Sequence, residues 1–169
     1  MASRGLLLVL VCFGFVAQVW AGHTLTGQQQ KILRNWLAQH PEYRLATDED
    51  CECSSDIKQM RAGYGGLWKA VPDYHPYIAT GDFNGDGVQD FAAVVVNLSK
   101  QQNNFTWLVF NGPFESAPPA FIQSGLDLKH HGLFYGPPRK RPYRLLVGAF
   151  ESDTGSLLIP KGRGYRLRH

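Results

Sequence analysis

The chain has 169 residues, with 17 Lys and Arg against 14 Asp and Glu, so its formal net charge is only +3. A balance this close to neutral gives no specific signal for nucleic acid or for any other strongly charged partner of the whole chain. The length fits one domain that is large enough to bury a core without many disulfides.

The first segment of the chain is typical of a secretory leader. Residues 5–20 form a nearly unbroken apolar run after Arg4, and Ala21 places a small residue where signal peptidase cuts. The alternative is a transmembrane anchor, but the run is short for a bilayer, contains Gln18 and has no basic flank after it. We therefore predict a signal peptide over 1–21 and one domain over 22–169, in a secreted or periplasmic protein without a transmembrane segment in the mature chain.

Two helices are predicted in the first part of the mature chain. Thr26 and Gln29 match a capping box, and the apolar residues that follow lie on one helical face as far as His40, which precedes a proline. The segment 26–40 is therefore predicted to be an amphipathic helix that packs on the rest of the fold. A second, shorter helix is predicted over 54–62, ended by a cluster of glycines.

After these glycines the sequence pattern becomes typical of strands. Short apolar or alternating runs are separated by Gly, Pro, Asn and Asp, and they predict strands over 77–80, 91–97, 105–111, 120–123, 133–135, 143–150, 156–159 and 165–168. Short connections favour antiparallel pairing. Two runs, 91–96 and 105–110, are apolar on both faces, so they are predicted as central strands with the helix of Trp36 covering one side. The expected fold is α+β, with an N-terminal amphipathic helix packed on a mainly antiparallel sheet.

The connection between two of these strands, DFNGDGVQD at 82–90, carries oxygen ligands at alternating positions. Its ligand side chains are Asp82, Asn84, Asp86 and Asp90, and the carbonyl of Val88 falls between the last two. Oxygen atoms spaced in this way, with glycines that let the chain curl, suit the six to eight ligands of Ca²⁺. An EF-hand would need a bidentate acid at position 12, where Ala93 lies inside a strand. The pattern predicts a shorter calcium loop, and a solvated Asp/Gly turn is the alternative.

The pattern D-F-N-G-D-G-x-x-D followed by a β run resembles the calcium loop of FG-GAP/VCBS-type repeats, found in the integrin β-propeller and in many secreted bacterial proteins. The resemblance covers about residues 77–97 and implies that Asp82, Asn84, Asp86 and Asp90 bind calcium, with Val88 acting through its carbonyl. The family pattern normally repeats to build propeller blades, whereas one copy is visible here. Neither a propeller nor a role in adhesion is therefore implied.

Cys51 and Cys53 are the two cysteines outside the predicted leader, in the acidic stretch DEDCECSSD. An exported protein meets an oxidising compartment, so we predict a local structural disulfide between them. Free thiols or an intermolecular bridge are the alternatives. The surrounding acids raise a thiol pKa and weaken its nucleophilicity, which argues against a redox role.

Two hypotheses of different classes follow. The first is an exported calcium-binding protein that acts as a non-enzymatic binding or accessory module for a cell-envelope polymer or a protein partner. The second is a secreted hydrolase in which His75 and Asp73 act as a general base near the loop, although no Gly-x-Ser-x-Gly motif marks a nucleophile. Basic residues gather from Lys129 onward, which suits either contact with anionic lipid, polysaccharide or nucleic acid, or simply solvated turns and strand faces.

Overall fold

The computed structural model describes residues 24–63, 69–114, 118–137, 141–152, 154–162 and 164–169. The predicted signal peptide, 1–21, lies outside these residues. The helical elements are α1 (Gly27–Gln39), the 3₁₀ helix η1 (Asp48–Cys51) and α2 (Ser54–Ala62). The strands are β1 (Tyr43–Leu45), β2 (Ile78–Gly81), β3 (Asp90–Asn97), β4 (Phe105–Phe110), β5 (Phe121–Leu126), β6 (His131–Phe134), β7 (Leu146–Ala149), β8 (Gly155–Lys161) and β9 (Gly164–Arg168).

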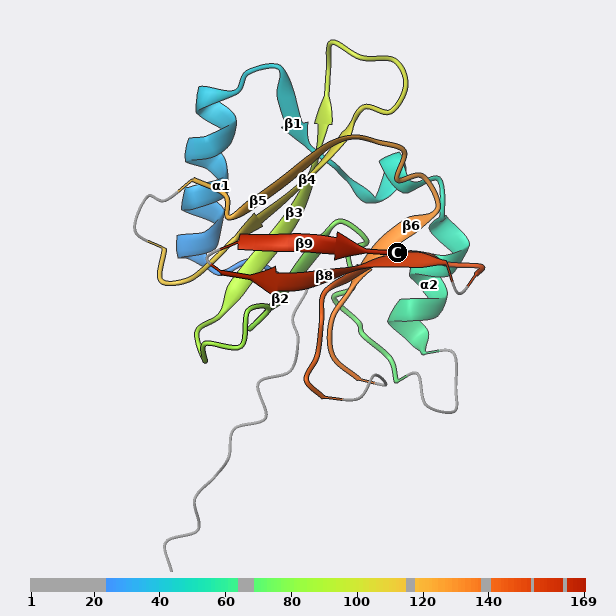
Figure 1. The fold of residues 1–169 in the computed structure, drawn as a ribbon. Helices are drawn as coiled ribbons and strands as arrows, with labels where there is room; N and C mark the ends of the chain where they lie inside the picture. Colours follow the sequence, from blue (N-terminus) through green and yellow to red (C-terminus); the bar gives the residue numbers. More distant parts are fainter. Residues whose placement is uncertain (1–23, 64–68, 115–117, 138–140, 153, 163) are drawn as a thin grey trace, which may run out of the picture.

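The strands form two antiparallel sheets, shown in Figure 1. The first has the order β1-β3-β4-β5, with β2 also paired to β3, and the second has the order β6-β7-β8-β9. The predicted combination of helices with antiparallel strands is confirmed, but the expectation of a single sheet is wrong. All backbone groups make the same kind of hydrogen bond, so a strand pattern does not say which strands will pair.

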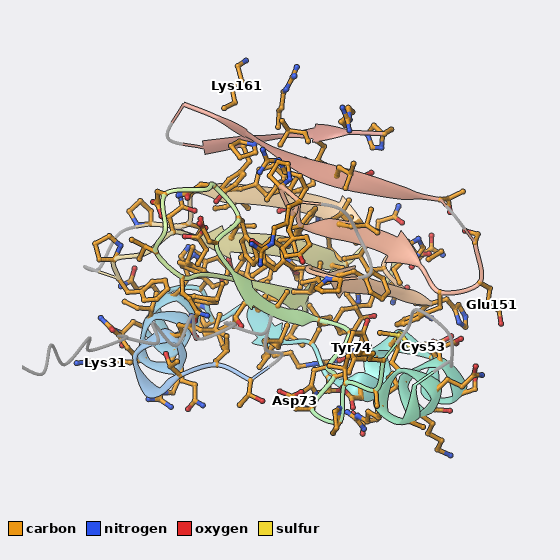
Figure 2. The ribbon with its side chains drawn as sticks, turned by 90° about the horizontal axis from the view of Figure 1, so that it is seen from below. Lys31, Cys53, Asp73, Tyr74, Glu151 and Lys161 are labelled. Carbon is orange, nitrogen blue, oxygen red and sulfur yellow. A yellow bond between two sulfur atoms is a disulfide. The ribbon has the colours of Figure 1, made fainter. Side chains whose placement is uncertain are left out.

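The first sheet is the middle layer of the molecule, and its strands β3 and β4 are buried along their whole length. On one face, Phe91, Ala93 and Val95 pack with Leu33 of α1. On the other face, Val94 and its neighbours pack against the second sheet, as the view in Figure 2 illustrates. The prediction of central strands covered on both sides, with α1 as one cover, is therefore confirmed.

The start of α1 is set by its capping residues. The backbone N–H of Gln29 donates to Thr26 Oγ1 at 3.3 Å, and the N–H of Thr26 donates to Gln29 Oε1 at 2.9 Å. The predicted capping box is thus formed, and His40 ends the helix by donating its N–H to Leu37. The label "N-terminal" needs correction, because α1 begins only at Gly27 and is merely the first element of the described chain.

The short elements β1 and η1 were not predicted, and an ion pair joins them. Arg44 donates to both carboxylate oxygens of Asp50 at 2.7 and 2.6 Å, and the N–H of Thr47 donates to the same carboxylate at 2.8 Å. These interactions, above all the hydrogen bonds from Arg44, lower the pKa of Asp50 from 3.8 to about 2. Because the pKa is lowered on folding, the stabilisation is present above about pH 4 and is lost as the pH falls through about 2.

We expect Asp50→Asn to reduce the loss of stability in acid. Between pH 4 and 2 the wild type should lose about 1 kcal/mol more unfolding free energy than the variant, a value kept small because Arg44 is half exposed to water. Urea unfolding across this range measures the difference. Asp73→Asn, at an exposed acid, is the control and should follow the wild type. Parallel pH profiles for the wild type and Asp50→Asn would show that the ion pair has no net effect.

Candidate functional site

The acid-rich loop at 82–90 is the turn of a β-hairpin. Strands β2 and β3 pair antiparallel, with Gly81 opposite Asp90, so both ends of the loop are fixed by the sheet. Gly85 and Gly87 have φ angles of 85° and 84°, a left-handed conformation that side chains disfavour. The predicted strands on each side and the predicted curl at the glycines are confirmed.

The exposed part of the loop is held by bonds between its own side chains and backbone. Asp82 Oδ1 accepts from the N–H groups of Gly85 and Asp86, and Asp82 Oδ2 accepts from Gly87. Asp86 Oδ1 accepts from the N–H of Val88 at 2.8 Å. The amide of Asn84 joins the same network, since its oxygen accepts from the N–H of Asp86 and its nitrogen donates to the Asp86 carboxylate. Backbone dipoles therefore offset part of the repulsion between the acids.

Asp90 differs from the other loop acids because it is fully buried. Its Oδ2 accepts from the N–H of Phe83 at 2.8 Å. Its Oδ1 accepts from the N–H of Gly112, in the connection after β4, at 2.9 Å. Burial raises the pKa of this carboxyl from 3.8 to about 6, although the backbone hydrogen bonds act in the opposite direction. Asp90 thus ties the base of the loop to the next connection of the same sheet.

Two tyrosines of the second sheet region also hold the loop, and sequence reasoning missed both. The hydroxyl of Tyr135 donates to the carbonyl of Asp82 at 2.6 Å, and its ring packs edge-on against Phe83. The hydroxyl of Tyr165 donates to Asn111 Oδ1 at 2.6 Å and lies 3.4 Å from Asp90 Oδ2. The loop is therefore a junction between the two sheets.

The oxygen atoms of the loop are of the type that calcium binds. The predicted ligands are all oxygen atoms within one connection, and a carboxylate offers about four lone-pair sites, so an oxygen that accepts an N–H can still bind a cation. Within the described residues, no three His, Cys, Asp or Glu side chains are already gathered as they are around a metal ion. The acids instead face backbone N–H groups, so ion binding requires Asp82 and Asp86 to turn toward a common centre.

Cys51 and Cys53 are linked to each other, as predicted. Both are buried: Cys51 is the last residue of η1, Cys53 immediately precedes α2, and both belong to the core cluster that includes side chains of the second sheet. Figure 2 shows Cys53 at the α2 end of the molecule. The pair is positioned as part of the core.

His75 and Asp73 are not partners in this structure. His75 Nδ1 lies 3.0 Å from Asp48 Oδ1 and 3.5 Å from Arg61, whereas the carboxylate of Asp73 accepts a hydrogen bond from Thr24. His75 does line a groove of about 590 Å³ beside α1. Its carboxylate neighbour is 27 positions away in sequence, and no local pattern could have identified it.

Comparison of the chain with protein-family models, curated proteins and solved structures found no match. The likeness to FG-GAP/VCBS-type repeats thus remains a resemblance of one loop. In the described part of the chain, no helix is both long and apolar enough to cross a membrane.

Proposed function

We propose that this protein is an exported, secreted or periplasmic, calcium-binding module with a non-enzymatic binding or accessory role. The ion would bind in the loop at 82–90, with Asp82, Asn84, Asp86 and Asp90 as side-chain ligands and Val88 as a carbonyl ligand. The observation that supports this most is that all these oxygen atoms lie in one hairpin turn or, for Asp90, at the first residue of the strand after it. The pairing of Gly81 with Asp90 fixes both ends of the turn.

The electrostatics of the loop favour a cation. Three carboxylates fall within nine residues, and Asp90 is buried, where an ionised carboxylate is costly. Backbone N–H groups carry only partial charges, so they compensate this cluster incompletely. A calcium ion adds a full opposite charge and binds the folded loop better than the unfolded chain.

The role of the ion in this proposal is structural. The loop receives hydrogen bonds from Tyr135 and Tyr165, so an ion that stiffens it also stiffens the contact between the two sheets. A rigid junction of this kind suits a module that presents a surface to a cell-envelope polymer or a protein partner. The hydrolase hypothesis loses its proposed pair, because His75 is next to Asp48 and not Asp73.

We expect calcium to stabilise the purified protein modestly. Extracellular calcium modules have dissociation constants of about 0.1–1 mM, so 1 mM free calcium adds about 0.4–1.4 kcal/mol. For a domain of this size, the melting temperature should rise by about 1–6 °C. Magnesium should have a much weaker effect, because its small octahedral shell fits a cage of protein oxygens poorly. Thermal melts in chelator, calcium and magnesium measure these shifts.

The matched variants are Asp86→Ala in the loop and Asp73→Ala at an exposed acid outside it. The calcium-dependent rise should vanish in Asp86→Ala and persist in Asp73→Ala. Comparing the rise within each variant removes any effect of the substitution on basal stability. Identical wild-type melts in chelator and calcium, with no heat of binding at millimolar calcium, would reduce the loop to an acidic turn.

A further inference from the structure

A cleft of about 450 Å³ opens beside the acid-rich loop. One wall is the loop itself, where Asp82, Gly85 and Gly87 line the space. The facing wall comes from the connection between β6 and β7 and includes Tyr135, Arg141, Tyr143 and Arg144. A wall with one carboxylate, that of Asp82, therefore lies opposite a basic and aromatic wall. The volume is within the usual range for small-molecule sites.

The two arginines of the basic wall are held by contacts with Tyr143, and neither has an ion-pair partner among the described residues. The guanidinium of Arg141 lies 5.5 Å from the centre of the Tyr143 ring, and Arg144 donates to the carbonyl of Tyr143 at 3.2 Å. Tyr135 packs edge-on against Tyr143 with ring centres 5.7 Å apart. Within the described residues, no carboxylate lies within ion-pair distance of either arginine. Arg141 is held against an aromatic ring and Arg144 by a backbone carbonyl. Two guanidinium groups without an ion-pair partner among the described residues are suited to an anionic ligand.

The two walls together restrict the ligand class. Arginine forks bind carboxylates in a bidentate manner, and tyrosine rings offer flat apolar faces for the C–H face of a sugar ring. The opposite wall offers acceptor oxygens, and Asp82 can accept hydrogen bonds from hydroxyl groups. A phosphate group or a nucleic acid backbone can also bind the arginines, but it presents mainly acceptors and so offers few hydrogen-bond donors to Asp82. An acidic sugar presents both a carboxylate and hydroxyl donors.

We propose that this cleft binds a carboxylate-bearing sugar of an acidic polysaccharide, with Arg141 and Arg144 on the carboxylate and Tyr143 against the ring. This extends the proposed function by naming the class of envelope polymer. Only the calcium dependence rests on the ion in the loop: calcium would reduce the negative charge that faces the ligand carboxylate, so it should raise the affinity for the sugar. Linkage then requires the sugar to raise the affinity for calcium by the same factor.

The test is calorimetric titration of the purified protein with trigalacturonate, first in chelator and then at 1 mM calcium. Maltotriose is the neutral control, and inorganic phosphate tests for a simple anion site. We expect trigalacturonate to bind in chelator and to bind more tightly with calcium. Maltotriose and phosphate should bind at least about tenfold more weakly, because each lacks half of the required chemistry.

Three single variants locate the site. Arg141→Gln, Arg144→Gln and Tyr143→Ala should each weaken trigalacturonate binding by about tenfold or more. Arg166→Gln removes the same charge from an exposed position on β9 outside the cleft and should change the affinity less than about twofold. Melting curves confirm folding, and Arg141 is exposed, so its replacement should leave the fold intact even if Arg144→Gln or Tyr143→Ala does not.

The proposal is overturned if trigalacturonate does not bind at millimolar concentration, if phosphate binds equally well, or if Arg141→Gln behaves like Arg166→Gln. Titration with calcium alone, without sugar, tests the ion site separately. Calcium binding without sugar binding would remove the cleft proposal and leave the calcium module. Sugar binding that requires Arg141, with no calcium binding, would support the cleft and remove the calcium module.

Discussion

Asp90→Ala is expected to destabilise the protein by about 2–5 kcal/mol, although Asp90 is only one of several loop acids. The carboxylate is buried and accepts the N–H groups of Phe83 and Gly112. Alanine would leave both donors without these acceptors, and an unpaired buried N–H costs about 1–3 kcal/mol. Urea unfolding in chelator measures the loss without a contribution from calcium.

Asp86→Ala is the matched control, because Asp86 is exposed and water can replace its hydrogen bonds. It should cost no more than about 1 kcal/mol. If Asp90→Ala lost as little unfolding free energy as Asp86→Ala, the hydrogen bonds from Phe83 and Gly112 to the Asp90 carboxylate would have no large effect on stability.

The pH dependence of Asp90 has the opposite sign to that of Asp50. Burial raises the pKa of Asp90 from 3.8 to about 6, so the folded chain holds a proton on this carboxyl more tightly than the unfolded chain does. Protonation of Asp90 therefore stabilises the folded state fully below about pH 3.8, and this stabilisation is lost as the pH rises through about 6. In chelator, the Asp90 carboxyl resonance should titrate near pH 6, and calcium should lower this midpoint.

The second large effect is expected for Trp107 in β4, which is fully buried between the two sheets. Its ring packs edge-on against Phe121 with centres 5.5 Å apart. Trp107→Ala should cost about 3–5 kcal/mol through lost burial and the cavity that remains. The melting temperature should then fall by about 6–20 °C.

Trp107→Phe should cost clearly less than Trp107→Ala, because the indole Nε1 has no hydrogen-bond partner in the described structure and phenylalanine keeps most of the apolar contact. The control is Ile122→Ala on the neighbouring strand β5, where the side chain is 52% exposed. It should change stability by less than about 0.5 kcal/mol. Equal losses for the alanine and phenylalanine variants would point to a polar role for the indole nitrogen.

The elements that could be predicted are those whose signals are local. Thr26 and Gln29 lie three residues apart and set the start of α1 by themselves. The runs that form β3 and β4 are apolar on both faces, and this reflects burial on both faces. By contrast, β1 has only three residues and exists because Tyr43 pairs with Asn97 at the far end of β3. A strand that depends on so distant a partner leaves little signal in its own sequence.

The same distinction applies to the candidate site. The loop acids were recognisable because nine consecutive residues contain them. Tyr135 was not, since it donates to a backbone carbonyl, and any residue at position 82 would offer that carbonyl. The partner of His75 was misjudged for a related reason. Asp73 is close in sequence, but η1 places Asp48 beside the ring, and only the tertiary fold decides between the two acids.

The contact of Tyr165 in the second sheet with Asp90 at the base of the loop can form only late in synthesis of the chain. Tyr165 is synthesised 75 residues after Asp90, which takes about 4–15 s at 5–20 residues per second. Early in this interval, before β6, β7 and β8 have emerged, the nascent chain can form β2, β3 and β4, but the face of Trp107 has no second sheet to cover it. A chaperone that binds apolar segments would find its target on this face, and the acid-rich loop would gain its last contacts only once β9 has emerged.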